Sequence, residues 1–377
     1  MGEVGWHLFL ASLPFAPLLE RRLDLWHGQA MWAVLWVSLL TCLALAQGIK
    51  AKHLPLAWWW AWTFVWVWWE FTKGIIGAKQ YNALLLMPLV HILAIGCFVL
   101  TACSQWTRQT VQRLSTTLAV LALVLTAYGW CQAMNLDPIF RNLEGATQKD
   151  IVGMIGNPTH FGAHLALLLP FVWVQSGKVW WGLRAASISL IGMILLRNAS
   201  LGGVLCLWAM GVAYLFWHCG WRWKAAGSLL LLSPLTMGWG VAAHPHLFSD
   251  SGRLTVWPLF AQLLHQHPWT GIGPGAIAFL SQTITSGPLQ QWRHVHNEWL
   301  QLTIEQGVIG LVIVLWALLR TMRQAWTYRT DPLVQMCAMV LLAFVVNSLI
   351  NFPAHLWVLG SLGLVAYCGI TVLAGEM

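Results

Sequence analysis

Apolar segments long enough to cross a bilayer recur along almost the whole of this chain. Several windows run for about 18 residues or more without a charged side chain, which is the length that a helix needs to span the hydrocarbon core. Hydrophobic residues make up 58% of the 377 residues and charged residues only 8%, a balance that excludes a water-soluble globular protein of ordinary composition. The pattern predicts an all-α, polytopic integral membrane protein in which residues 1–377 form a single transmembrane domain.

The apolar pattern divides into roughly twelve expected transmembrane helices. The first segment contains Pro14 and Pro17 and runs on into further spans, so it does not have the form of a cleavable signal peptide. The segments near residues 180 and 201 also fit a re-entrant pair. The expected segments are residues 6–19, 28–47, 54–71, 84–103, 114–134, 159–175, 180–196, 201–217, 223–242, 299–319, 333–351 and 355–374.

Lys and Arg residues, which collect on cytoplasmic loops, set the expected orientation. With the amino terminus inside, nine bases and nine acids balance on the outer side, and the whole formal net charge of +8 belongs to the inner side. An anionic substrate outside must therefore be held by a few placed arginines, and the chain has no basic stripe of the kind that binds nucleic acid. The expected inner charges are Lys50, Lys52, Arg108, Arg113, Lys178, Arg184, Arg222, Lys224, Arg320, Arg323 and Arg329, with the acids Glu3, Asp331 and Glu376.

The largest polar stretch is residues 243–298, an outer loop between the ninth and tenth expected spans. Residues 254–264 carry apolar side chains at helical spacing, which predicts a short amphipathic helix along the membrane surface. The sequence HPWTGIGPG at residues 267–275 ends that helix and makes a turn. Because the residues with chemical potential converge here, we expect this periplasmic loop to form part of the active site.

Asn297 is the expected N-cap of the helix that follows this loop. That position puts His296 just outside the positive end of the helix, where an imidazolium is disfavoured and a neutral ring can accept a proton. The same helix end attracts anions such as phosphate. The alternative is that His296 only makes hydrogen bonds in a wet loop.

Arg253 and Arg293 flank the loop, and Arg197 lies at the outer end of an apolar segment. A guanidinium binds a phosphate or diphosphate bidentately while it stays charged, although an arginine near the membrane also reaches lipid headgroups without any further role. Glu305 lies about 12 Å along its helix, where a carboxylate is costly and usually paired. We expect Arg197 or Arg253 to be its partner.

The 14 histidines raise the question of a metal site. His160 and His164 have i, i+4 spacing and two His-x-His pairs follow, but no nearby carboxylate completes a ligand set such as HExxH. The eight cysteines fall singly, without a CxxC pair, and form neither a disulfide framework nor a zinc site. We therefore expect no metal and no cofactor. The tryptophan runs at residues 58–69 are typical of spans and membrane interfaces.

Four motifs in the chain resemble those of one family. The run HNEWLQLTIEQGVIG, residues 296–310, is similar to the signature that opens a late transmembrane helix in the O-antigen ligase and polymerase superfamily, which includes the bacterial protein O-oligosaccharyltransferases. Residues 251–275 look like the segment that precedes it, IGNPTHFGAHLALLLPF resembles an earlier Asn-Pro motif, and NSLINFPAHLWVLG matches a late one. The resemblance covers roughly residues 150–360, and the amino-terminal third is similar only in hydropathy.

The resemblance implies a multi-spanning transferase of the bacterial inner membrane that takes a glycan from undecaprenyl diphosphate on the periplasmic side, without a metal. His296 matches the essential loop histidine of the family, the base on the acceptor hydroxyl, and Arg253 matches an arginine that holds the diphosphate. The family often has a further arginine at an outer helix end. Here that stretch reads ASLGG with Leu201 at the position, and Arg197 lies one helical turn earlier. The remaining expected site residues are Arg293 as a helper and Glu305, Asn297 and His160 as supporting residues.

Three reactions are open within the superfamily. A ligase passes the glycan to lipid A-core, a polymerase to another carrier-linked repeat, and a protein O-oligosaccharyltransferase to a Ser or Thr of a protein such as pilin. The outer segment 135–158 offers only Arg141 and Lys149, so a second arginine-rich loop of the kind expected for a polymerase is lacking, and we favour the ligase of lipopolysaccharide biosynthesis. A flippase or transporter is the non-enzyme alternative, and it predicts internally repeated halves that the sequence does not show.

Overall fold

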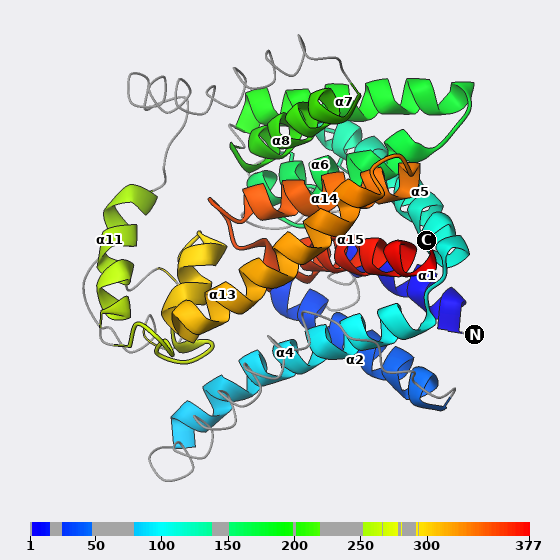
Figure 1. Cartoon of the computed structure of the whole chain (residues 1–377). Coiled ribbons are helices and arrows are strands. Elements are labelled where there is room, and N and C mark those ends of the chain that lie inside the picture. Colours follow the sequence, from blue (N-terminus) through cyan, green and yellow to red (C-terminus); the bar gives the residue numbers. More distant parts are fainter. Residues whose placement is uncertain are drawn as a thin grey trace.

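The computed structural model describes residues 2–15, 25–46, 79–137, 151–198, 201–218, 252–265, 267–277, 280, 292 and 294–377. All regular elements in these ranges are helices, which confirms the all-α prediction for them (Figure 1). They are α1 (Gly2–Ser12), α2 (Leu25–Ala46), α4 (Lys79–Gln105), α5 (Arg108–Ala133), α6 (Pro158–Val174), α7 (Lys178–Asn198), α8 (Leu201–His218), α11 (Arg253–Leu264), α13 (Glu298–Thr327), α14 (Pro332–Asn347), the 3-10 turn η2 (Pro353–His355) and α15 (Trp357–Glu376).

The helices α5, α13 and α15 are long and apolar enough to cross a membrane by length and composition, among the residues searched. Other described helices, including α6 and α14, are apolar but shorter. The count of about twelve spans stays a prediction, because the expected segments 54–71 and 223–242 lie outside the described residues. Helix α1 ends at Ser12 and continues as a 3-10 turn over residues 13–15, which include Pro14.

Helix α6 forms the centre of the core. Every residue from His160 to Val172 is buried, because α5, α7, α8, α14 and α15 all pack against this helix. A helix that is apolar on all sides is stable only when neighbours surround it. The predicted helices near residues 180 and 201 are α7 and α8, which lie beside α6 and beside each other (Figure 1).

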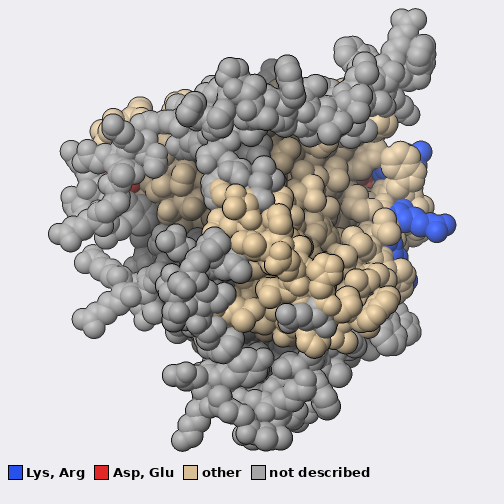
Figure 2. Space-filling model, turned by 90° about the vertical axis from the view of Figure 1, so that its left-hand side faces the viewer, with Lys and Arg blue, Asp and Glu red and all other residues tan. Residues whose placement is uncertain are grey.

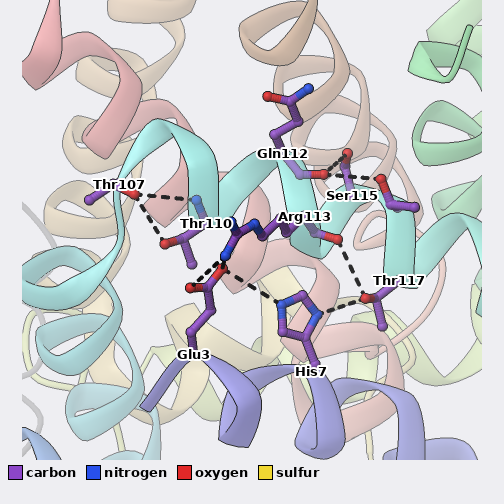
Figure 3. Close-up of polar contacts among 9 residues, drawn as sticks. Glu3, His7, Thr107, Thr110, Gln112, Arg113, Ser115 and Thr117 are labelled. Atoms are coloured by element: carbon purple, nitrogen blue, oxygen red, sulfur yellow. Dashed lines mark hydrogen bonds and ion pairs between the residues drawn. The ribbon is translucent and has the colours of Figure 1, made fainter. Parts of the chain in front are cut away.

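One end of the bundle holds five of the charges that the sequence assigns to the inner side. Arg113 on α5 pairs with Glu3 on α1 at 3.2 Å (Figure 3), and Arg108 pairs with Asp331. The backbone amide of Arg108 also donates to the Glu376 carboxylate at 3.1 Å. These contacts bring together all three acids that were expected inside, at the end where both chain termini lie (Figure 1). Which side of the membrane this end faces stays a prediction.

The opposite end carries α11 and the start of α13 (Figure 1). Figure 2 views the molecule from this side. Most of the described surface in that view is neither acidic nor basic, and the visible Lys and Arg side chains are confined to one edge.

Helix α13 is broken at Gly307, where φ is 70° and ψ is −177°. The Pro-Gly loop, residues 267–275, fills the break and pairs with the backbone on both sides of it. The bonds run from Ile272 N to Ile304 O (2.9 Å), from Gly273 N to Glu305 O (3.0 Å), from Val308 N to Pro268 O (2.9 Å) and from Ile309 N to Trp269 O (3.3 Å). Backbone groups that a break would leave unpaired in an apolar environment are thus satisfied by the loop.

Two glycines make this close approach possible. A Cβ on Gly307 would meet the Trp269 carbonyl, and a Cβ on Gly271 would meet the Glu305 backbone. Both residues also have left-handed φ values, 70° and 73°, which glycine adopts without steric cost. Gly307 of the QGVIG motif and Gly271 of the TGIGPG motif are therefore needed for a structural reason. The two backbone segments are in contact at these positions and leave no room for a side chain.

The break divides α13 into two halves of different character. In residues 298–306 the polar side chains of Gln301, Glu305 and Gln306 are buried, so Glu305 belongs to a half that is enclosed by protein. Beyond Gly307 a row of apolar side chains is exposed, with exposed fractions of 55% at Val312 and 70% at Leu319. An exposed apolar row on a helix is the surface that a membrane would cover.

Gly307→Ala should destabilise the protein, because alanine disfavours the left-handed backbone by about 1–2 kcal/mol before any clash with Trp269 is counted. Gly211→Ala in α8 is the matched control, since a Cβ there meets no atom within 4 Å. Thermal unfolding in detergent micelles should show a clearly lowered Tm for the first variant and an unchanged or raised Tm for the second. Equal Tm values would contradict the account of the break.

Candidate active site

Phe352 is the centre of a group of histidines at the start of α13. Its side chain is buried, and the rings of three histidines pack on it: His294 is stacked at 4.4 Å between centroids, and His296 and His160 stand edge to face at 4.7 Å and 5.2 Å. Two of these rings come from the histidine loop, residues 292–297, and His160 comes from α6. Aromatic pairs of this geometry stabilise a fixed ring arrangement.

His296 has a left-handed backbone, with φ of 55°, which is uncommon for a residue other than glycine. Its ring stands at 82° to that of Trp292, with 5.1 Å between centroids, and its buried Nδ1 has no hydrogen-bond partner in the described part of the chain. Burial and the positive charge of Arg253 lower the pKa of His296 to about 4. The ring is therefore neutral near neutral pH, as expected. The main cause of the lowered pKa is burial, whereas the sequence analysis attributed it to the positive end of the helix.

The N-cap prediction for Asn297 is confirmed, because its side-chain oxygen accepts a hydrogen bond from the Leu300 amide at 3.0 Å. Asn157 does the same for α6 and accepts from the amides of Thr159 and His160 at 2.9 Å and 3.2 Å. Pro158 follows as the first helical residue, a position that needs no amide donor. The Asn-Pro motif thus starts the helix that places His160 against Phe352.

Arg253 is the first residue of α11, after Gly252 in a left-handed conformation. Helix α11 is attached to the histidine loop, since Trp257 Nε1 donates to the Val295 carbonyl at 2.8 Å. Val256 and Phe260 pack with Val295 and Ile304 in a small apolar cluster. This packing holds the Arg253 guanidinium where its charge acts on His296. The structure therefore brings together the two residues that the sequence analysis matched to the base and to the diphosphate-binding arginine.

Two other predicted arginines are not placed by the structure. Arg197 lies near the end of α7, but its side chain is outside the described residues, and Arg293 is outside them altogether. Their roles stay predictions. Gly202, next to Leu201 in the ASLGG stretch, is so close to Asn347 and Asn351 that a Cβ would meet their side-chain amides. Two of the family-like motifs are therefore neighbours in space.

Glu305 is buried in the enclosed half of α13. Its carboxylate accepts hydrogen bonds from Gln301 Nε2 at 3.3 Å and from the backbone amides of Gly275 and Ile277. A carboxylate that accepts backbone amides orders the segment that supplies them, here the end of the Pro-Gly loop. The expected arginine partner of Glu305 stays a prediction.

Glu298 and His355 were missed by the sequence analysis. Glu298 Oε1 lies 2.9 Å from His355 Nδ1, and Oε2 accepts from the Ala354 amide at 3.1 Å. One feature of the sequence could have pointed to Glu298. Its spacing from Gln301 and Glu305 places the three side chains on one face of the helix. His355, the partner of Glu298, is 57 residues further along the chain, inside the NFPAH motif. No local sequence pattern connects Glu298 with His355.

The charge of His355 depends on several neighbours. Burial lowers its pKa, but the charge and hydrogen bond of Glu298, followed by the charge of Glu305, outweigh burial and raise the pKa to about 9. Gln301 Nε2 lies 3.2 Å from His355 Nε2 on the other side of the ring. In the described residues no three His, Cys, Asp or Glu side chains are placed to hold a metal.

Asn297→Ala should lower the free energy of unfolding by about 1 kcal/mol, because the α13 amides lose their side-chain acceptor. Asn297→Asp is the matched control, since it keeps the acceptor and adds a negative charge at the positive helix end. Unfolding of the purified protein in micelles should rank the alanine variant below both others. An alanine variant as stable as the wild type would contradict the capping role.

A comparison with known families finds one match, which includes much of this site. Residues 165–315 match the family model of O-antigen ligase, a region that holds Arg253, His296 and Glu305. No curated protein matches the chain closely enough to count as a relative. This match falls on the region that carries the histidine loop, and it supports membership of the chain in the O-antigen ligase superfamily of membrane glycosyltransferases.

Proposed function

We propose that this protein is an O-antigen ligase that transfers a glycan from undecaprenyl diphosphate to a hydroxyl of lipid A-core at the periplasmic face of the bacterial inner membrane. The family match supports the reaction class, since it covers O-antigen ligase and polymerase-type enzymes. The observation that carries the proposal is the half-buried His296, with its ring packed on Phe352 and its pKa lowered by burial and by the neighbouring cationic Arg253. A base and a guanidinium next to each other are what displacement of a diphosphate by a hydroxyl requires.

In the proposed reaction the oxygen of the acceptor hydroxyl forms a bond to the anomeric carbon of the glycan. The bond from that carbon to the diphosphate oxygen breaks, and its electron pair leaves with the diphosphate. His296 takes the hydroxyl proton, and Arg253 stabilises the charge that develops on the leaving group. No oxidant, metal or cofactor is needed for this balance, because arginines supply the positive charge.

The remaining roles rest on the sequence for the two arginines and on contacts in the structure for the supporting residues. Arg197 and Arg293 are proposed as further contacts to the diphosphate. Glu305 and Asn297 support the site by ordering the Pro-Gly loop and the start of α13, and His160 supports it through Phe352. The loop 243–298 is proposed to lie on the periplasmic side as part of the active site.

His296→Ala should reduce transfer by roughly 100-fold to 10,000-fold, which is the usual contribution of a general base. His265→Ala is the matched control, because His265 is an exposed histidine at the end of α11 and has no role in the proposed reaction. Transfer is measured in membranes that hold equal amounts of each variant. Full activity of the His296 variant would exclude the base.

The transfer rate should fall on the acid side only as pH drops through about 4, since His296 must be neutral to accept a proton and its pKa is about 4. This fall of the rate at low pH is the acid limb of the pH profile, and a histidine with an unperturbed pKa would place it near pH 6.5. The pH dependence of the rate is measured with the donor at saturation. A fall of the rate near pH 6.5 would contradict the lowered pKa of His296.

Deletion of the gene distinguishes the ligase from its relatives. Loss of capped lipopolysaccharide with accumulation of full-length carrier-linked polymer is the result expected for a ligase. Single repeats on lipid A-core would indicate a polymerase, and normal lipopolysaccharide with an unglycosylated pilin would indicate the protein transferase. Glycan trapped on the cytoplasmic side would indicate a flippase.

A further inference from the structure

The Phe352 loop, residues 348–356, is attached to the start of α13 through one residue. The backbone amide of Glu298 donates to the carbonyls of Ser348 at 2.8 Å and Asn351 at 3.2 Å. Its carboxylate binds the Ala354 amide and His355 Nδ1 at 3.1 Å and 2.9 Å. Phe352 lies between these attachment points, so Glu298 holds the loop on both sides of the ring that the histidines pack on.

Gln301, on the same face of α13 as Glu298, makes further contacts with the histidine loop, His355 and Glu305. Gln301 Oε1 accepts from the Val295 amide at 3.1 Å, which fixes the residue between His294 and His296. Gln301 Nε2 contacts His355 and Glu305 at 3.2 Å and 3.3 Å. The first half of α13 thus joins the Phe352 loop, the histidine loop and the Pro-Gly loop through neighbouring side chains.

We propose that Glu298 and His355 are positioning residues, which act through Phe352 to hold the His296 ring against Arg253. The inference rests on the proposed function, because it assigns their role in the transfer reaction. Neither residue needs to touch the substrate. Their contribution comes from geometry, since a shift of about 1 Å at a reacting group can cost roughly 100-fold in rate.

The link from His355 to His296 passes through ring contacts. His355 lies 5.0 Å from His294 between centroids, and His294 stacks on Phe352. Within the part of the chain that the structure describes, the charged and titratable groups that act on His296 are Arg253 on α11 and His160 on α6. If Phe352 moves, His296 becomes more exposed to water and less close to Arg253, and both changes make protonation easier.

The test uses two substitutions of His355 that separate its nitrogens. Asparagine puts an amide N–H near the Nδ1 position and keeps the bond to Glu298, whereas glutamine mimics Nε2 and loses it. We expect His355→Asn to keep most of the wild-type kcat and His355→Gln to lose about 10-fold to 100-fold, with the KM for the carrier-linked donor unchanged. His7→Gln is the control, because His7 also lies near a glutamate, Glu3, but on α1 at the other end of the bundle.

The pH profile distinguishes positioning from a general loss of stability. In His355→Gln the acid limb should move from about 4 toward 6.5, while in His355→Asn and His7→Gln it should stay near 4. Loss of activity without movement of the limb would contradict the inference, and so would a fully active glutamine variant. Failure of the proposed function looks different, because the wild-type protein itself would then transfer no glycan.

Discussion

The pairing of the Pro-Gly loop with the break at Gly307 is the contact on which the rest of the site depends. A helix in an apolar environment cannot open unless other groups satisfy its backbone, and residues 268–273 supply donors and acceptors on both sides of the break. The break in turn separates a half of α13 that faces protein from a half that exposes apolar side chains. Polar residues such as Gln301 and Glu305 can therefore be buried in a helix whose other half is suited to lipid.

The enclosed half-helix organises the site through one face. Glu298, Gln301 and Glu305 each hold a different loop, and the loops carry or support Phe352, His296 and the Pro-Gly turn. Helix α11 adds Arg253 from another direction. Because these contacts are made to backbone groups and to the His355 ring within the protein itself, they fix the loops without a substrate. Such preorganisation is the main way in which a protein without a cofactor stabilises a developing charge.

Local signals in the sequence predicted much of this arrangement. The capping role of Asn297, the helix at residues 254–264 and the all-helical core follow from residue types and spacing, and the structure confirms them. The break at Gly307 was missed, because a glycine inside an apolar helix is usually tolerated and its partner loop lies about 35 residues earlier. Phe352 and His355 were missed for the same reason, since contacts across more than 50 residues leave no periodic trace in either segment.

The account is tested most directly by hydrogen exchange of the backbone amides of Ile272, Gly273, Val308 and Ile309, measured on the substrate-free protein in micelles. The pairing predicts that these amides exchange as slowly as those in the interior of α13, although two of them belong to a loop rich in glycine. Exchange at the rate of an exposed turn would contradict it. The break in α13 would then be unsupported, and the histidines around Phe352 would have no fixed frame.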